Sequence, residues 1–168
     1  MKKYFSLIKF SHTVFAMPFA FIGFFLASKT YDFEWITLIY VTLCMIFARS
    51  SAMAFNRYID RKIDSQNVRT ANVREIPNGS ISPNNALIFV ILNSILFITI
   101  TYFINSLCFA LSPVALLIIL GYSYTKRFTS LCHIILGLGL ALAPIGAYLA
   151  VSGEFNITPI LFSLAVLF

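Results

Sequence analysis

Charged residues are scarce in this sequence. Only 11% of its 168 residues are charged, whereas 60% are hydrophobic and 16% are aromatic. A soluble domain has roughly a quarter of its residues charged, so this composition excludes an ordinary soluble fold and indicates an integral membrane protein. The net charge of +6 therefore gives no support to nucleic-acid binding, because basic residues in membrane proteins mainly report orientation.

Cysteine is also rare, and its placement argues against redox or metal chemistry. Cys44, Cys108 and Cys132 fall within or at the edge of apolar runs, at spacings unlike those of a metal site. We interpret them as packing residues. A cleavable signal peptide is not expected either, since the first apolar run is too long for a signal core and no clear small-residue cleavage site follows it.

Long apolar runs dominate the chain. Five of them are about long enough to cross a bilayer, and a sixth begins near Ile157 but reaches Phe168 after too few residues to do so. The five runs cover residues 10–28, 35–55, 86–103, 107–124 and 131–151. The sequence therefore predicts an all-α, polytopic transmembrane bundle with five spanning helices and the start of a sixth. We find no repeat or linker that would divide residues 1–168 into domains.

Basic residues predict the orientation. With the N-terminus inside, the segments on that side hold ten lysines and arginines, and the outside loops hold Lys29 as their only basic residue. Positive charge is enriched on the cytoplasmic side of membrane proteins. We therefore expect the N-terminus and the long polar segment 56–85 to be cytoplasmic, in an integral membrane protein of a bacterial inner membrane.

Three oxygen-bearing side chains follow the second run at intervals of four residues. Asn56, Asp60 and Asp64, here called the ligand row, would lie on one face of a helix. Carboxylate and amide oxygens suit Mg²⁺ or Ca²⁺, and Mg²⁺ takes its remaining ligands from water and phosphate. The row therefore points to a phosphorylated ligand. The alternative is a charged cytoplasmic loop whose basic residues face solvent or lipid head groups.

Arg49 lies inside the second apolar run, about two helical turns before Asn56 and on roughly the same face. An unpaired arginine at such a depth costs at least ~2.5 kcal/mol, so Arg49 should have a partner. The partner is either a ligand or an ion-pairing residue, unless the side chain extends to the membrane interface.

The ligand row, followed by Arg69-Thr70 and the turn Pro77-Asn78-Gly79, resembles the UbiA-type membrane prenyltransferases. Tyr122-x-x-x-Lys126 is similar to that family's Tyr-x-x-x-Lys element. Segments 11–20 and 136–148 are similar to the branch that prenylates 4-hydroxybenzoate and related aromatic acids for quinone synthesis.

The resemblance implies a bundle of about nine spanning helices, with two aspartate-rich motifs facing each other across a cavity and binding Mg²⁺ on a polyprenyl diphosphate. The second motif would fall beyond Phe168, so residues 1–168 are expected to be the N-terminal part of a single prenyltransferase domain. The expected roles, by residue, are Mg²⁺ binding for Asn56, Asp60 and Asp64, with Asp60 and Asp64 catalytic; diphosphate binding for Arg69, Arg74, Tyr122 and Lys126; and binding of the acceptor's carboxylate for Arg49.

Two positions depart from the family pattern. Arg57 stands where an aspartate is frequent, and Val73 lengthens the spacing from Arg69 to Arg74 by one residue. No general base for the final ring proton is evident, since Asp60, Asp64 and water remain open. Other acceptors within the family also remain open: a dihydroxynaphthoate for menaquinone, a chlorin or haem. The alternatives of another class are a small cation transporter and a non-catalytic truncated product.

Overall fold

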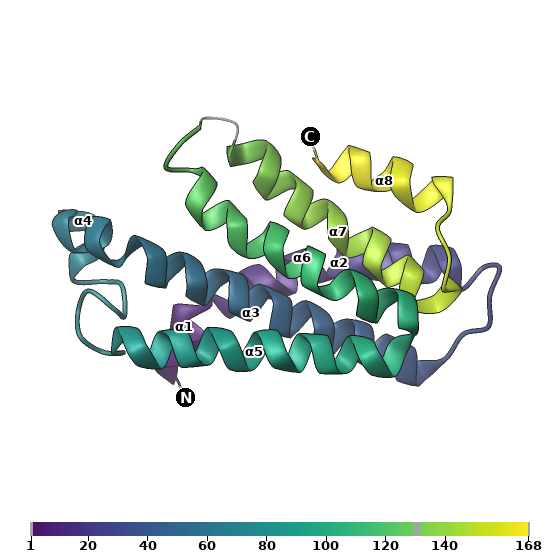
Figure 1. The fold of residues 1–168 in the computed structure, drawn as a ribbon, viewed down its shortest axis with the longest axis horizontal. Coiled ribbons are helices and arrows are strands. Elements are labelled where there is room, and N and C mark those ends of the chain that lie inside the picture. The colour runs from purple at the N-terminus through teal and green to yellow at the C-terminus, as the bar shows by residue number, and fades with distance from the viewer. Residues whose placement is uncertain (1, 130–131, 168) are drawn as a thin grey trace.

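The computed structural model describes residues 2–129 and 132–167, and within them the chain forms helices and connecting loops without a strand. Figure 1 shows long helices running roughly along the long axis of the molecule. In chain order the helices are α1 (Lys2–Leu7), α2 (Phe10–Ala27), α3 (Trp35–Gln66), α4 (Val68–Ala71), α5 (Pro83–Ile104), α6 (Ser106–Thr125), α7 (Cys132–Ser152) and α8 (Ile157–Leu167).

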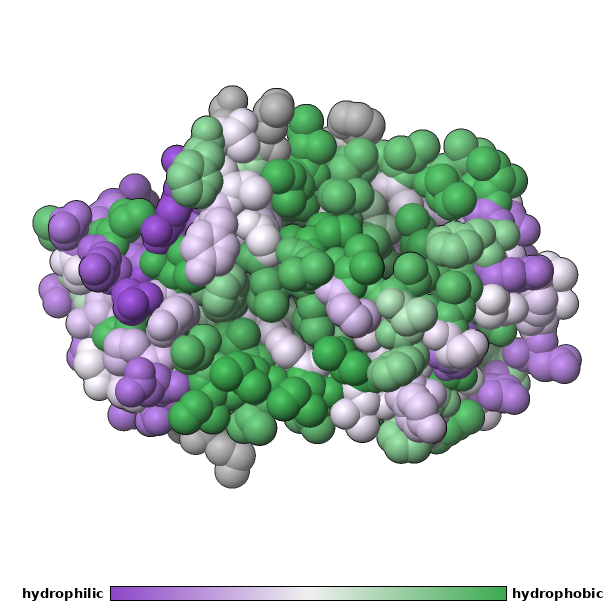
Figure 2. All heavy atoms as spheres, in the orientation of Figure 1, coloured by the Kyte–Doolittle hydropathy of each residue, from purple (hydrophilic) through white to green (hydrophobic). Residues whose placement is uncertain are grey.

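The prediction of an all-α membrane protein is confirmed. Helices α2, α3, α5, α6 and α7 are each long and apolar enough to cross a bilayer, whereas α8 has 11 residues in the part of the chain that the structure describes. Leu131, the predicted first residue of the fifth span, lies outside the described residues. Figure 2 shows a broad hydrophobic belt between two more hydrophilic ends, as a protein embedded in lipid requires.

Helix α3 is the longest element and carries the ligand row near its C-terminal end. Its 32 residues contain neither glycine nor proline, so nothing interrupts the backbone hydrogen bonds between Trp35 and Gln66. Such a helix is about 48 Å long, well beyond the roughly 30 Å of a bilayer's hydrocarbon core. At its end, the Asn67 side chain accepts a hydrogen bond from the Arg69 backbone N–H at 3.0 Å and starts the short helix α4.

Helix α3 packs mainly against α5 and α6, and α2 packs mainly against α7. The α2–α7 contact is close because Gly23 lies against the backbone of Pro144, where no Cβ would fit. At the sharp turn between α5 and α6, the Asn105 side chain caps α6 by accepting from Cys108 N–H at 2.7 Å and donates to the Leu149 carbonyl of α7 at 2.9 Å. One polar side chain thus joins three helices.

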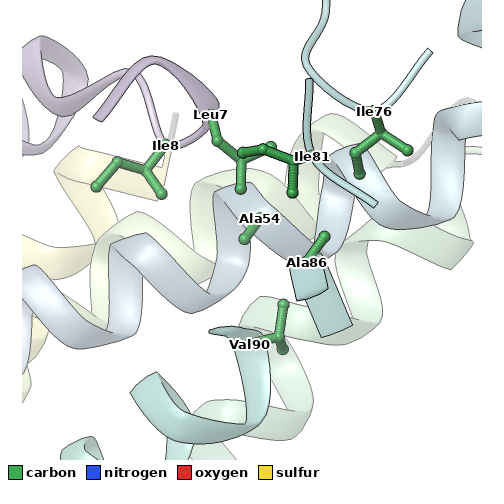
Figure 3. Packing of buried hydrophobic residues seen from close by; sticks show 7 residues of the cluster. All are labelled: Leu7, Ile8, Ala54, Ile76, Ile81, Ala86 and Val90. Atoms are coloured by element: carbon green, nitrogen blue, oxygen red, sulfur yellow. The ribbon is translucent and has the colours of Figure 1, made fainter. Parts of the chain in front are cut away.

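A short N-terminal helix, which we did not expect from the sequence, is held against the charged end of the bundle. Residue Lys9, in the left-handed region with φ of 44°, separates α1 from α2. Figure 3 shows a buried apolar cluster gathered around Ala54 of α3, with members from α1, the loop after α4 and the first turns of α5. Its members are Leu7, Ile8, Ala54, Ile76, Ile81, Ala86 and Val90.

The opposite end of the molecule has a polar contact of its own. The Tyr31 hydroxyl, between α2 and α3, donates a hydrogen bond to the Glu154 carboxylate, between α7 and α8. This bond favours the protonated phenol and raises the pKa of Tyr31 to about 12. Two loops far apart in sequence are therefore linked at the end away from the ligand row.

Candidate functional site

The ligand row turns around α3 along its length. A helix advances about 100° per residue, so each step of four residues rotates the side chain by about 40°. Asn56 and Asp60 share one partner, Lys126, whereas Asp64 pairs with Arg74. The three side chains therefore lie along a spiral of about 80° rather than in a straight line. Asp60 and Asp64 are both buried.

Lys126 connects the end of α6 to the first two members of the row. Its ammonium group donates hydrogen bonds to Asn56 Oδ1 and Asp60 Oδ2. The Tyr122 ring lies one turn earlier on α6, with its centroid 5.9 Å from Lys126 Nζ. Two residues predicted to bind diphosphate are thus brought to two predicted metal ligands, although 66 to 70 positions separate Lys126 from them in the sequence.

Arg127 also belongs to this group, although its sequence position did not predict it as a site residue. Its Nη2 donates to the Ile59 carbonyl at 2.6 Å and lies 3.8 Å from Asp60 Oδ1. Its position directly after Lys126 was the available signal, but a basic residue at a helix end is usually a topology signal. Asp60 is consequently held between two cations from the same end of α6.

Asp64 is bound from the other side, by the loop that follows α4. The Arg74 guanidinium pairs with Asp64 Oδ2, and the Thr70 hydroxyl donates to the Asp64 carbonyl at 2.8 Å. The additional residue Val73 is 72% exposed, so the loop accommodates it at the surface. The lengthened spacing therefore does not carry Arg74 away from the ligand row.

The donor atoms of the row fit a hard cation. Asp60 Oδ1 is buried and lacks a hydrogen-bond partner within the described residues, so it retains acceptor capacity, whereas Asp64 Oδ2 is buried against Arg74. Two carboxylates and an amide oxygen are ligands that Mg²⁺ accepts, with water and phosphate completing its octahedron. The same part of the chain contains no cluster of three or more His, Cys, Asp or Glu side chains, so these residues supply only part of a metal's coordination.

An apolar cavity of about 540 Å³ lies beside α3 and extends along α6 and α7. Arg49, Asn56 and Tyr122 contribute to its wall, which confirms that Arg49 and Asn56 share a face of α3. The Arg49 Nε is buried without a hydrogen-bond partner, and no carboxylate of residues 2–129 or 132–167 lies within ion-pairing distance of its guanidinium. An unpaired cation beside an apolar cavity favours binding of an anionic group.

A second hollow, of about 720 Å³, lies on the next face of α3. Its charged and titratable lining residues come from the α1–α2 junction, α3 and the segment after Asn67, and they are Lys9, His12, Arg57, Arg69, Arg74 and Glu75. The predicted diphosphate-binding residues are therefore divided. Tyr122 and Lys126 lie with Asn56, whereas Arg69 and Arg74 line this basic hollow, which Arg74 connects to Asp64.

A protein-family model described as the UbiA prenyltransferase family matches residues 16–168. The chain is 37% identical over 122 residues to a 4-hydroxybenzoate octaprenyltransferase of Aliivibrio salmonicida, and the match covers 72% of this chain and 42% of that protein. It is 33% identical over 130 residues to a protoheme IX farnesyltransferase of Vibrio vulnificus, covering 74% of this chain and 42% of that one. The chain thus spans less than half the length of these curated relatives.

Solved structures show the same arrangement of helices. The apo structure of a UbiA homologue from Aeropyrum pernix K1 has a TM-score of 0.84 and 30% identity, covering 94% of this chain and 59% of that one. A UbiA homologue from Archaeoglobus fulgidus, bound to DMAPP and Mg²⁺, has a TM-score of 0.77 at 22% identity, covering 98% and 59% of the two chains. At 22% identity, the likeness to the Archaeoglobus fulgidus structure is evidence for the fold and not for function.

Proposed function

Because the chain belongs to the UbiA prenyltransferase family, we propose that its protein transfers a polyprenyl group from a polyprenyl diphosphate to an aromatic acid such as 4-hydroxybenzoate. We further propose that residues 1–168 are the N-terminal part of a single prenyltransferase domain. In the reaction, the bond between the allylic carbon and the diphosphate oxygen breaks, a bond to a ring carbon forms, and the ring loses a proton.

The contact of Lys126 with Asn56 and Asp60 carries this proposal. A diphosphate leaving group gains negative charge as its bond to carbon breaks, and cations fixed in a water-poor site stabilise that charge. Lys126 would exchange its contact with Asp60 for a phosphate oxygen, and Tyr122 would donate a hydrogen bond to the same group. Arg74 reaches the row through Asp64, while the role of Arg69 rests on the family resemblance alone.

The ligand row is proposed to hold Mg²⁺. Asn56, Asp60 and Asp64 are the residues that would hold it, directly or through water. When bound, Mg²⁺ neutralises negative charge on the diphosphate. Asp60 and Asp64 would therefore act by holding the donor in place, and the buried Asp60 Oδ1, which has no hydrogen-bond partner among the described residues, supports the assignment.

Arg49 is proposed to bind the carboxylate of the acceptor. A guanidinium can make two parallel hydrogen bonds to a carboxylate, which fixes the direction of an attached ring. Arg49 and Asn56 line the same cavity about two turns apart, so an acid held by Arg49 would lie on the membrane side of the ligand row. The apolar walls of the cavity suit an aromatic ring and a prenyl chain.

A second acceptor class has a specific observation in its favour. The protoheme IX farnesyltransferase relative is nearly as similar to this chain as the 4-hydroxybenzoate relative, so a haem acceptor must be compared directly. A dihydroxynaphthoate, the precursor type for menaquinone, would present the same carboxylate to Arg49. Acceptor identity is therefore the part of the proposal that most needs an assay.

The protein is an integral membrane protein, and we propose a bacterial inner membrane with the ligand-row end on the cytoplasmic side. The basic residues gathered at that end support this orientation. A donor diphosphate could then reach the ligand row from the cytoplasm while its apolar tail stays in the membrane.

The proposal is tested by prenyl transfer in membranes that contain the protein expressed from its complete gene. A radiolabelled polyprenyl diphosphate is supplied with 4-hydroxybenzoate, a dihydroxynaphthoate or protohaem, in Mg²⁺ or in EDTA. We expect Mg²⁺-dependent labelling of an aromatic acid. Labelling of protohaem alone would contradict the proposed acceptor, and no labelling of any acceptor, with verified protein in the membrane, would contradict the proposed reaction.

A further inference from the structure

The basic hollow beside Arg57 is separate from the apolar cavity. Asn56 lines the cavity and Arg57 lines the hollow, and adjacent residues of a helix point about 100° apart. The two spaces therefore open on neighbouring sides of α3. The lining of the hollow includes residues of the α1–α2 junction and of the segment that begins with α4. Figure 1 shows α4 at one end of the molecule, and Figure 2 shows that this end is hydrophilic.

Positive charge is in excess around this hollow. Four basic side chains line it, namely Lys9, Arg57, Arg69 and Arg74. Two carboxylates lie against this set: Glu75, which is in the lining and accepts a hydrogen bond from the Ser6 hydroxyl, and Asp64, which pairs with Arg74. Four cations against two carboxylates leave two positive charges without an anionic partner.

Arg57 is the least satisfied of these cations. Its side chain lines the hollow although the residue is only 7% exposed, and its Nε is buried without a hydrogen-bond partner. Within residues 2–129 and 132–167, no carboxylate lies within ion-pairing distance of it. A buried charge without a partner is costly, so this guanidinium favours an anion that enters the hollow.

The donors around the hollow suit a phosphate group. Arg57 belongs to α3 and Lys9 to the α1–α2 junction, so the two cations approach the space from different segments. A phosphate offers three or four oxygens in a tetrahedral arrangement and accepts donors from several directions, whereas a carboxylate offers two oxygens in one plane. Phe5 and Phe10 add apolar surface to the lining, which a phosphate ester carrying carbon atoms could contact.

We propose that this hollow is a phosphate-binding site distinct from the donor site, with Arg57 as its central ligand and Lys9 as a further ligand. The phosphate comes either from an anionic phospholipid head group or from free inorganic phosphate. Both sources present the same chemistry at a membrane surface, and they are separated by experiment.

The test uses the protein from its complete gene, purified without Mg²⁺ and with bound lipid exchanged. In the first arm, native mass spectrometry counts phosphatidylglycerol or phosphatidylcholine retained from nanodiscs. In the second arm, equilibrium dialysis measures binding of radiolabelled inorganic phosphate. The variant Arg57→Gln removes the central charge, and Lys62→Gln is the matched control, because Lys62 is an exposed residue of the same helix outside the hollow.

We expect Arg57→Gln to weaken binding about tenfold or more, and Lys62→Gln to leave it unchanged. Loss of retained phosphatidylglycerol identifies a lipid head group, and loss of inorganic phosphate binding alone identifies the free ion. Equal binding by the wild type and Arg57→Gln in both arms would overturn the proposal. Phosphate binding that is lost in Lys126→Gln but kept in Arg57→Gln would also overturn the proposal, because the anion would then occupy the donor site.

A second variant keeps the test decisive if Arg57→Gln fails to fold. Lys9 is exposed and lines the hollow, so Lys9→Gln should preserve the fold. We expect this variant to weaken phosphate binding at least threefold. Unchanged binding, in protein with a wild-type elution profile, would contradict the assignment.

Discussion

Arg49 and Arg57 occupy the same helix, eight residues apart, and differ in what surrounds them. Each has a buried Nε without a hydrogen-bond partner, and neither pairs with a carboxylate in the part of the chain that the structure describes. Arg49 borders an apolar cavity, whereas Arg57 borders a hollow lined by other cations. Because the two guanidinium groups are chemically alike, the different anions proposed for them rest on the difference between their neighbours.

The cations around the ligand row behave differently from these two arginines. Lys126 and Arg74 are each paired with a carboxylate of the row, so a ligand must replace that contact before either cation can act on it. Arg49 and Arg57 need no such exchange. The described residues thus include cations that pair with carboxylates of the ligand row and cations that have no carboxylate partner.

The largest effect on activity is expected from a substitution among the ligand-row carboxylates that pair with cations. Asp60→Asn keeps the size of the side chain but removes the charge that would hold Mg²⁺ and that now faces Lys126 and Arg127. We expect prenyl transfer to fall about 100-fold or more, measured as kcat in membranes with saturating donor and Mg²⁺. Asp32→Asn, in an exposed loop before α3, is the control and should retain wild-type activity. Retained activity in Asp60→Asn would contradict the assigned role.

A smaller effect is expected at the first of the two unpaired arginines. Arg49→Ala removes the proposed partner of the acceptor's carboxylate, so the acceptor KM should rise roughly 10- to 100-fold while the donor KM stays unchanged. Steady-state kinetics with each substrate varied in turn measures the two constants, and Lys62→Ala serves as the control. An unchanged acceptor KM, or an equal rise in both constants, would remove Arg49 from the acceptor site.

Helix packing away from both arginines should affect stability and not the choice of substrate. In Gly23→Ala the added Cβ would overlap the Pro144 backbone, forcing α2 and α7 apart. We expect a loss of about 1–3 kcal/mol, seen as a lower midpoint of thermal unfolding in detergent. Gly146→Ala is the matched control, because no atom lies within 4 Å of a Cβ at that position. Equal midpoints for the two variants would contradict the close approach of α2 and α7.

The smallest effect is expected at a third arginine of α3. Arg61 is satisfied locally, since its Nη1 donates to the Tyr58 carbonyl at 2.7 Å and its guanidinium lies 4.3 Å from the centroid of the Tyr58 ring. Arg61→Gln should change stability by less than about 1 kcal/mol and leave acceptor KM and phosphate binding unchanged. A change in acceptor KM or in phosphate binding would contradict the idea that only arginines without a local partner bind these anions.

Much of the fold was predictable because membrane helices follow from composition. The apolar runs gave the five spanning helices, and the absence of glycine and proline between Trp35 and Gln66 is consistent with one helix that continues beyond the membrane. The separate helix α1 was not predicted, because the left-handed conformation at Lys9 has no clear sequence signal in a residue other than glycine.

The members of the candidate site could be proposed from the sequence, but their arrangement could not. The four-residue spacing placed Asn56 and Asp60 together, but it concealed the rotation that turns Asp64 toward Arg74. The contribution of Arg127 and the isolation of Arg57 depend on contacts between segments distant in sequence, which helical periodicity does not report. Such contacts require the packed structure.

The most direct test of this account is a structure of the protein from its complete gene, with Mg²⁺ and a non-reactive prenyl diphosphate analogue. The account predicts the diphosphate beside Asn56 and Asp60, with Lys126 moved from Asp60 onto a phosphate oxygen and the prenyl chain in the cavity bordered by Arg49. A diphosphate seated instead in the hollow beside Arg57, with Lys126 still paired to Asp60, would contradict it.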